Sequence, residues 1–129
     1  MWADQRERLA RIEAALTIAA RDPPRLDRGD AAAWLVGRLA EPRAEGQATI
    51  VSHSIALQYF PEMTRAAVRD AMEREGGAAT PERPLGWLRY EIDPEFDGHP
   101  SLRLRLWPGG PDRILALVDA HARAVRWKV

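Results

Sequence analysis

The feature that most constrains the fold is a change in the spacing of the apolar residues after ATPERP, at residues 79–84. Before this segment, apolar residues recur every three or four positions, as on amphipathic helices. After it they alternate with polar residues, most clearly in SLRLRLW at 101–107, as in half-buried strands. We therefore expect a first half of helices around one strand, followed by an antiparallel β-meander.

Three helices are predicted in the first half, over residues 4–20, 30–39 and 61–75. Leu9, Ile12 and Leu16 form the apolar stripe of the first helix, which makes it amphipathic. Asp30 is placed to cap the second helix, because its short acidic side chain can accept a backbone N–H of the first turn. Trp34 is expected to lie on the buried face of that helix, with Leu35 and Leu39.

The largely apolar segment at residues 48–54 is predicted to be a strand between helices. Such a strand suggests a sheet that helices cover on both faces. Further strands are expected near 85–92, at 101–107, at 112–118 and within 123–129, with turns at 108–110 and 119–122. No repeat or linker divides the chain, so residues 1–129 are taken as a single α/β domain.

The composition excludes several classes of protein. Nineteen basic residues balance nineteen acidic ones, so no net charge draws the chain to nucleic acid or to anionic membranes. No cysteine is present, which excludes disulfides, thiolate nucleophiles and cysteine-ligated metals. The charged start has no apolar signal-peptide core, and no run approaches the ~20 apolar residues that span a bilayer. We therefore expect a cytoplasmic protein.

His53 and Ser54 are the first candidate site residues, because they end the predicted strand at 48–54. Ligands of open α/β sheets bind at the carboxyl ends of strands, and we expect this strand to be central in the sheet. His53 is a candidate base near neutral pH. Alternatively, both side chains satisfy backbone groups where the strand ends. A third interpretation, in which they line a pocket, is the one that we prefer.

Gln58, Tyr59 and Glu91 complete the candidate cleft. Gln58 and Tyr59 would clamp a ligand, or, as we prefer, Tyr59 packs its ring beneath the sheet and leaves its hydroxyl at the surface. Glu91 would be a general base, or Arg89 or Arg103 neutralises it, which is the interpretation that we favour. The sequence assigns no catalytic residue.

The three histidines, His53, His99 and His121, match no metal-binding spacing, so no metal site is predicted. The sequence also lacks a serine-hydrolase elbow, a Walker motif and a Gly-x-Gly-x-x-Gly run. Those enzyme classes therefore have no support.

Several segments, taken in order, resemble a known family. They are MWADQRERLARIEAAL, RGDAAAWL, TIVSHSIALQYFP, PLGWLRYE, LRLRLWPGG and the final H…VRW. Together they resemble the C-terminal part of the uncharacterised bacterial domain-of-unknown-function family 2332, over nearly the whole chain. That family in turn resembles the S-adenosylmethionine-dependent methyltransferase fold.

The resemblance implies a partial Rossmann-like mixed sheet, in which the chain is the C-terminal portion of a larger methyltransferase-like domain. The glycine-rich loop that holds the methyl donor would lie upstream of Met1, so the chain itself is expected to bind no cofactor. S-adenosylmethionine would bind only a longer family protein. The chain also carries Ala3 where the family commonly has proline, and Ala122 where it commonly has glycine.

Two functional hypotheses follow. In the first, the chain is the late part of a methyltransferase-like domain and is inactive alone. In the second, it is a non-catalytic interaction or structural module that self-associates, because a partial sheet leaves apolar surface that a homodimer would cover. The resemblance supplies neither a substrate nor a reaction.

Overall fold

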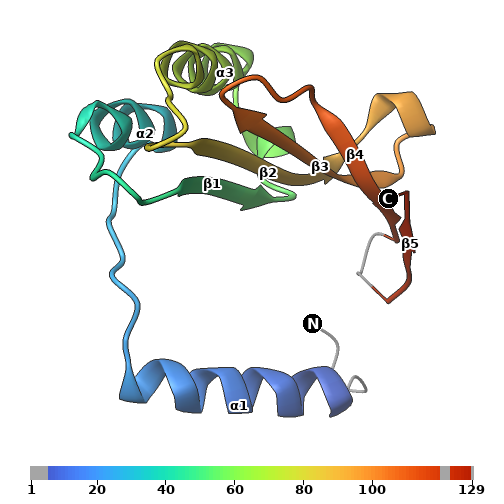
Figure 1. The fold of residues 1–129 in the computed structure, drawn as a ribbon. Helices are drawn as coiled ribbons and strands as arrows, with labels where there is room; N and C mark the ends of the chain where they lie inside the picture. The colour runs from blue at the N-terminus through green and yellow to red at the C-terminus, as the bar shows by residue number, and fades with distance from the viewer. Residues whose placement is uncertain (1–5, 120–122, 129) are drawn as a thin grey trace.

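The computed structural model describes residues 6–119 and 123–128. Within them the chain forms three α-helices, five strands and two short 3₁₀ helices (Figure 1). In chain order these elements are α1 (Arg6–Arg21), α2 (Ala31–Ala40), β1 (Thr49–Ser54), η1 (Leu57–Tyr59), α3 (Glu62–Gly77), β2 (Leu85–Ile92), η2 (Pro94–Phe96), β3 (Pro100–Trp107), β4 (Arg113–Val118) and β5 (Val125–Trp127).

Every predicted helix and strand is confirmed, with ends shifted by one or two residues in most elements. The cap of α2 is also confirmed, because Asp30 Oδ1 accepts the N–H of Ala33 at 2.9 Å. The predicted turn at 119–122 lies mostly outside the described residues. Local sequence signals were therefore sufficient to locate the elements.

The sheet has the order β1-β2-β3-β4-β5. β1 pairs with β2 in parallel, and the remaining neighbours pair antiparallel. The predicted antiparallel meander is thus confirmed, and β1-α3-β2 forms one parallel βαβ unit. The expectation that β1 is central is wrong, because β2 is its only strand partner among the described residues.

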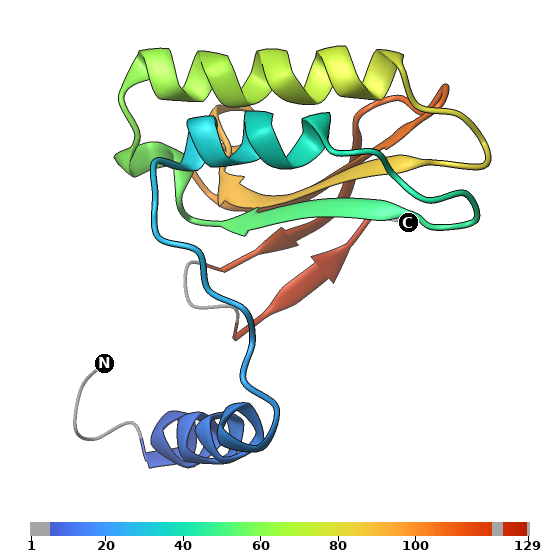
Figure 2. The ribbon, with the colours of Figure 1, turned by 90° about the vertical axis from the view of Figure 1, so that its left-hand side faces the viewer.

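Helices cover one face of the sheet rather than both. α2 and α3 lie side by side on that face (Figure 2). The core between these helices and the sheet consists of Ala32, Leu35, Leu39, Val68, Ala71, Met72, Leu85, Trp87 and Trp107. α1 lies apart on the opposite side (Figure 1), and none of its residues is buried within the described structure. An extended segment that contains Pro23 and Pro24 follows α1, and proline there cannot continue the helix.

The strand register shows which residues share the helix-covered face. Trp87 lies opposite Arg105, and Arg89 lies opposite Arg103. Because Trp87 belongs to the core, the arginines of β2 and β3 lie on the face under the helices, and the intervening leucines lie on the other face. The alternation in β3 led us to expect a half-buried strand with its arginines facing solvent, and that side of the expectation is wrong.

The face without a described helix, which we call the leucine face, is apolar. It carries Ile50 of β1, Leu88 of β2, and Leu104 and Leu106 of β3. Gly86 allows two of these side chains to close over β2, since a Cβ there would lie 2.6 Å from Ile50 Cδ1 and 3.1 Å from Leu106 Cδ2. Ile50 is 54% exposed and Leu106 is 46% exposed, so this face is partly exposed to solvent.

Trp34 departs from its predicted position. Leu35 and Leu39 are buried as expected, whereas Trp34 is 47% exposed. Its indole N–H donates to Asp27 Oδ2 at 2.9 Å, which holds the ring at the surface between α2 and the preceding segment. Burying it would have left that N–H without an acceptor.

Candidate functional site

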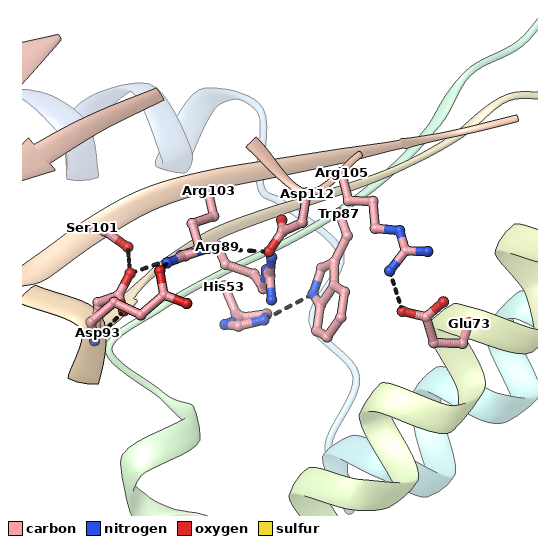
Figure 3. A network of polar contacts seen from close by, with 10 residues as sticks. His53, Glu73, Trp87, Arg89, Asp93, Ser101, Arg103, Arg105 and Asp112 are labelled. Atoms are coloured by element: carbon pink, nitrogen blue, oxygen red, sulfur yellow. Dashed lines mark hydrogen bonds and ion pairs between the residues drawn. The ribbon is translucent and has the colours of Figure 1, made fainter. Parts of the chain in front are cut away.

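Two of the predicted site residues, His53 and Glu91, contact each other on the helix-covered face. His53 Nδ1 lies 2.6 Å from Glu91 Oε1. The other ring nitrogen, Nε2, accepts the indole N–H of Trp87 at 3.0 Å (Figure 3). The side chains of His53 and Glu91 are only 15% and 14% exposed. The three residues thus form a chain of hydrogen bonds from the core to the end of β1.

The indole of Trp87 determines the protonation of His53. Because an indole nitrogen can only donate, His53 Nε2 must carry a lone pair. The ring proton is then on Nδ1, which donates to Glu91. A base needs a free lone pair that a substrate proton can reach, and Trp87 occupies the only one that His53 has. In this arrangement both ring nitrogens of His53 have hydrogen-bond partners within the protein.

Glu91 also binds the backbone where β1 ends. Its Oε1 accepts the N–H of Ala56 at 2.9 Å and that of Leu57 at 3.3 Å. Ile55, just before them, has a left-handed backbone with φ of 48°. This conformation is strained for a β-branched residue, and it turns the two N–H groups toward the carboxylate. Glu91 therefore stabilises the turn that joins β1 to η1.

The expected neutralisation of Glu91 by Arg89 or Arg103 is wrong. Arg89 forms an ion pair with Asp112 and lies over the Trp87 ring, 4.4 Å from its centroid. Arg103 Nε donates to Asp93 Oδ2 at 2.7 Å. Both arginines pair with carboxylates other than Glu91, and they share Asp112. The side chain that contacts the Glu91 carboxylate is that of His53.

Asp93 is the centre of a second polar cluster, just after β2. It is 5% exposed, and its Oδ2 accepts both the Arg103 guanidinium and the Ser101 hydroxyl, the latter at 2.5 Å (Figure 3). Burial alone would raise the pKa of Asp93. The hydrogen bonds from Arg103, Ser101 and the N–H of Glu95 outweigh burial, and they hold the pKa below its usual value of 3.8.

The other three predicted residues do not join His53. Ser54 is exposed at the end of β1, on the opposite face from His53. Gln58 and Tyr59 lie in η1, and both are exposed. Tyr59 is 76% exposed, so our expectation that its ring packs beneath the sheet is wrong. The short helix η1 turns this ring outward instead.

A cavity of about 340 Å³ lies beside His53, between α2, β1 and η1. Its lining is mainly apolar and includes Val51, Leu57, Phe60 and Trp34. His53 also lines this cavity, and both of its ring nitrogens already form hydrogen bonds within the protein. Arg25, Asp27 and Ser52 also line the cavity, so polar groups lie at its margin beside the apolar surface.

No group of three or more His, Asp or Glu side chains that could hold a metal ion occurs in residues 6–119 and 123–128. His99 lies in the loop before β3, and His121 is outside the described residues. None of the helices in the described part of the chain is long and apolar enough to cross a membrane.

Sequence reasoning missed Trp87 and Asp93. Trp87 was one of five tryptophans, and only the strand register places its indole against His53. Asp93 precedes Pro94 and caps η2 by accepting the N–H of Glu95 at 3.0 Å. An Asp-Pro pair after a strand is a typical turn signal, and it could have drawn attention to this residue.

The comparisons with known proteins give one match. The family whose profile matches residues 1–127 is described as "Uncharacterized protein conserved in bacteria (DUF2332)". The chain belongs to this family. No curated protein and no solved structure matches this DUF2332 chain. The expected family is therefore confirmed, and the hydrogen-bonded trio of His53, Trp87 and Glu91 lies within the matched region.

Proposed function

We propose that this chain is a non-catalytic association module, and that its leucine face packs against the same face of a second copy. The observation that carries the proposal is the side on which the leucines of β3 lie. Leu104 and Leu106 lie opposite the helix layer. A contiguous exposed apolar patch typically marks an interaction site.

The surface area of the chain supports this proposal. The chain exposes 9551 Å², whereas a compact monomer of 14.5 kDa exposes about 6,900 Å². The surplus of about 2,700 Å² exceeds the ~800 Å² that each partner contributes to a standard interface. It includes α1, none of whose residues is buried, as well as the leucine face. A second copy also meets no net electrostatic repulsion, because the formal charge of the chain is zero.

The state of His53 supports a non-catalytic role. Trp87 and Glu91 form hydrogen bonds with its two ring nitrogens, and Glu91 also accepts hydrogen bonds from backbone N–H groups. A catalytic pair would have to give up these hydrogen bonds at a cost to the fold. The pocket-lining role that we prefer for His53 does not require this, and it stays part of the proposal.

Sedimentation velocity over a range of concentrations tests the proposal. We expect a concentration-dependent dimer that Leu106→Lys disrupts, because the charge would be buried at the centre of the interface. Leu26→Lys is the matched control, since Leu26 is 86% exposed and lies in the segment before α2. A chain that stays monomeric at the highest attainable concentration, or a dimer that both variants preserve, contradicts the proposal.

A second candidate function is that of the C-terminal portion of a methyltransferase-like domain. The parallel unit β1-α3-β2 favours it, because such units build Rossmann-like sheets. No glycine-rich loop precedes α1 in the sequence, so we expect no calorimetric binding of S-adenosylmethionine to this chain. Saturable binding at micromolar concentrations would show that a donor site is present after all.

A further inference from the structure

The outer edge of β1 lies beside a groove whose lining includes Ile50, a residue that also belongs to the leucine face. The groove measures about 520 Å³, and residues of α2 and of the 41–52 segment line it. α2 forms its wall on the helix side, and β1 forms its floor. No described strand pairs with this edge.

The register shows which backbone groups point into the open. The N–H of Thr49 donates to Pro84 O at 3.0 Å, and that of Ile55 donates to Tyr90 O at 2.7 Å. Odd-numbered residues of β1 therefore direct their N–H and C=O groups toward β2. Since these groups alternate along a strand, those of Ile50, Ser52 and Ser54 point outward. The edge offers three donors and three acceptors in strand spacing.

Natural edge strands are normally protected against pairing by lysine, proline or a bulge. The β1 sequence TIVSHS contains neither lysine nor proline, and its register with β2 is regular. The edge of β1 thus lacks these protective features against pairing with another strand.

The groove also carries a cation without a carboxylate. Arg38 pairs with Glu41, whereas Arg43 has no carboxylate partner among the described residues. Arg43 Nη2 only approaches Glu75 O, at 3.5 Å, and its Nη1 is buried with no acceptor in the described structure. A carboxylate near the start of β1 would complement Arg43.

We infer that the groove binds an extended polypeptide segment that carries a carboxylate and adds to β1 as a further strand of the sheet. The backbone groups of the edge would provide the pairing, and Arg43 would bind the carboxylate. The charge of Arg43, which has no carboxylate partner among the described residues, favours an acidic segment as the occupant.

The probe is a fluorescein-labelled peptide of eight residues, which alternates valine and threonine and ends in glutamate. Anisotropy titration of the whole chain should give saturable binding. The same peptide with alternate amides N-methylated cannot donate to the edge, and we expect it to bind about tenfold more weakly or worse. Replacing glutamate by glutamine, with an amidated end, should weaken binding to the chain but not to its Arg43→Gln variant.

Amide hydrogen exchange locates the binding site. The N–H groups of Ile50, Ser52 and Ser54 should exchange quickly in the free chain and become protected when the peptide is added, while that of Val51 is slow throughout. Ser52→Pro should fold normally, since its outward N–H has no partner in the sheet, and should abolish peptide binding. Thr17→Lys, on exposed α1, is the control that should leave binding unchanged.

Two results would overturn the inference. One is the absence of saturable binding, or equal binding of the unmodified and the N-methylated peptide. This measurement uses only the unaltered chain, so it does not depend on the folding of a variant. The other is protection of the three edge amides in the peptide-free chain that disappears on dilution, because the occupant would then be a second copy. Neither result bears on Leu106→Lys, so this inference and the leucine-face dimer can fail separately.

Discussion

Glu91→Ala tests whether the His53 cluster stabilises the fold. The Glu91 carboxylate is 14% exposed and accepts hydrogen bonds from His53, Ala56 and Leu57. Truncation leaves the His53 N–H buried without an acceptor, whereas water can reach the two backbone groups near the surface. At about 1–3 kcal/mol for a buried donor and less for the others, the loss in unfolding free energy is about 2–4 kcal/mol.

For a chain of this length, each kcal/mol lowers the melting temperature by about 4 °C, so we expect a fall of about 8–16 °C. Urea and thermal denaturation followed by circular dichroism measure both quantities. Glu95→Ala is the matched control, because Glu95 is 66% exposed in its ion pair with Arg103 and should cost less than about 1 kcal/mol. The double variant with His53→Ala should be less destabilised than the sum of the single variants. Equal effects of Glu91→Ala and Glu95→Ala would refute the reasoning.

Two further predictions concern packing and acid stability. A Cβ on Gly76 would lie 2.3 Å from Trp107 Cε2, whereas one on Gly77 meets nothing within 4 Å. Gly76→Ala should therefore lower the unfolding free energy by about 1–3 kcal/mol and Gly77→Ala should not, as urea titration of both will show. Because hydrogen bonds keep the pKa of Asp93 below 3.8 in the folded chain, its contribution to stability is present above about pH 4 and is lost as the pH falls below that value. Asp93→Asn removes this contribution, so its unfolding free energy should decline less steeply between about pH 4 and pH 2; identical slopes would contradict the assignment.

The positions of the elements were predictable because each depends on a local signal. Asp30 caps α2 through a carboxylate three residues from its donor, and Pro61 immediately precedes α3. Neither signal depends on distant parts of the chain. The exposure of Trp34 was less predictable, because its hydrogen bond to Asp27 competes with burial.

The contact between His53 and Glu91 could not be predicted from the sequence, although both residues were candidates for the site. They are 38 positions apart, and their meeting depends on the register of β1 against β2. His53 lies opposite Arg89, which puts Glu91 two residues further along β2 on the same face. A shift of one residue would have turned Glu91 to the leucine face. To predict the polar partners of a strand residue, one needs the exact strand register. The hydrophobic pattern indicates only which face each residue takes.

In β3 the arginines lie on the helix-covered face and the leucines on the other, and the tryptophans explain why. Alternation shows that the two sets lie on opposite faces, but it does not show which face the helices cover. Trp87 and Trp107 are in phase with the arginines, and both belong to the core. Arg105 lies 4.7 Å from the centroid of the Trp107 ring and pairs with Glu73 of α3 at 2.6 Å. Its stem covers the aromatic ring while its charge is neutralised from the helix. The helix layer therefore packs against the arginines, and the leucines lie on the face that we propose a second copy would cover.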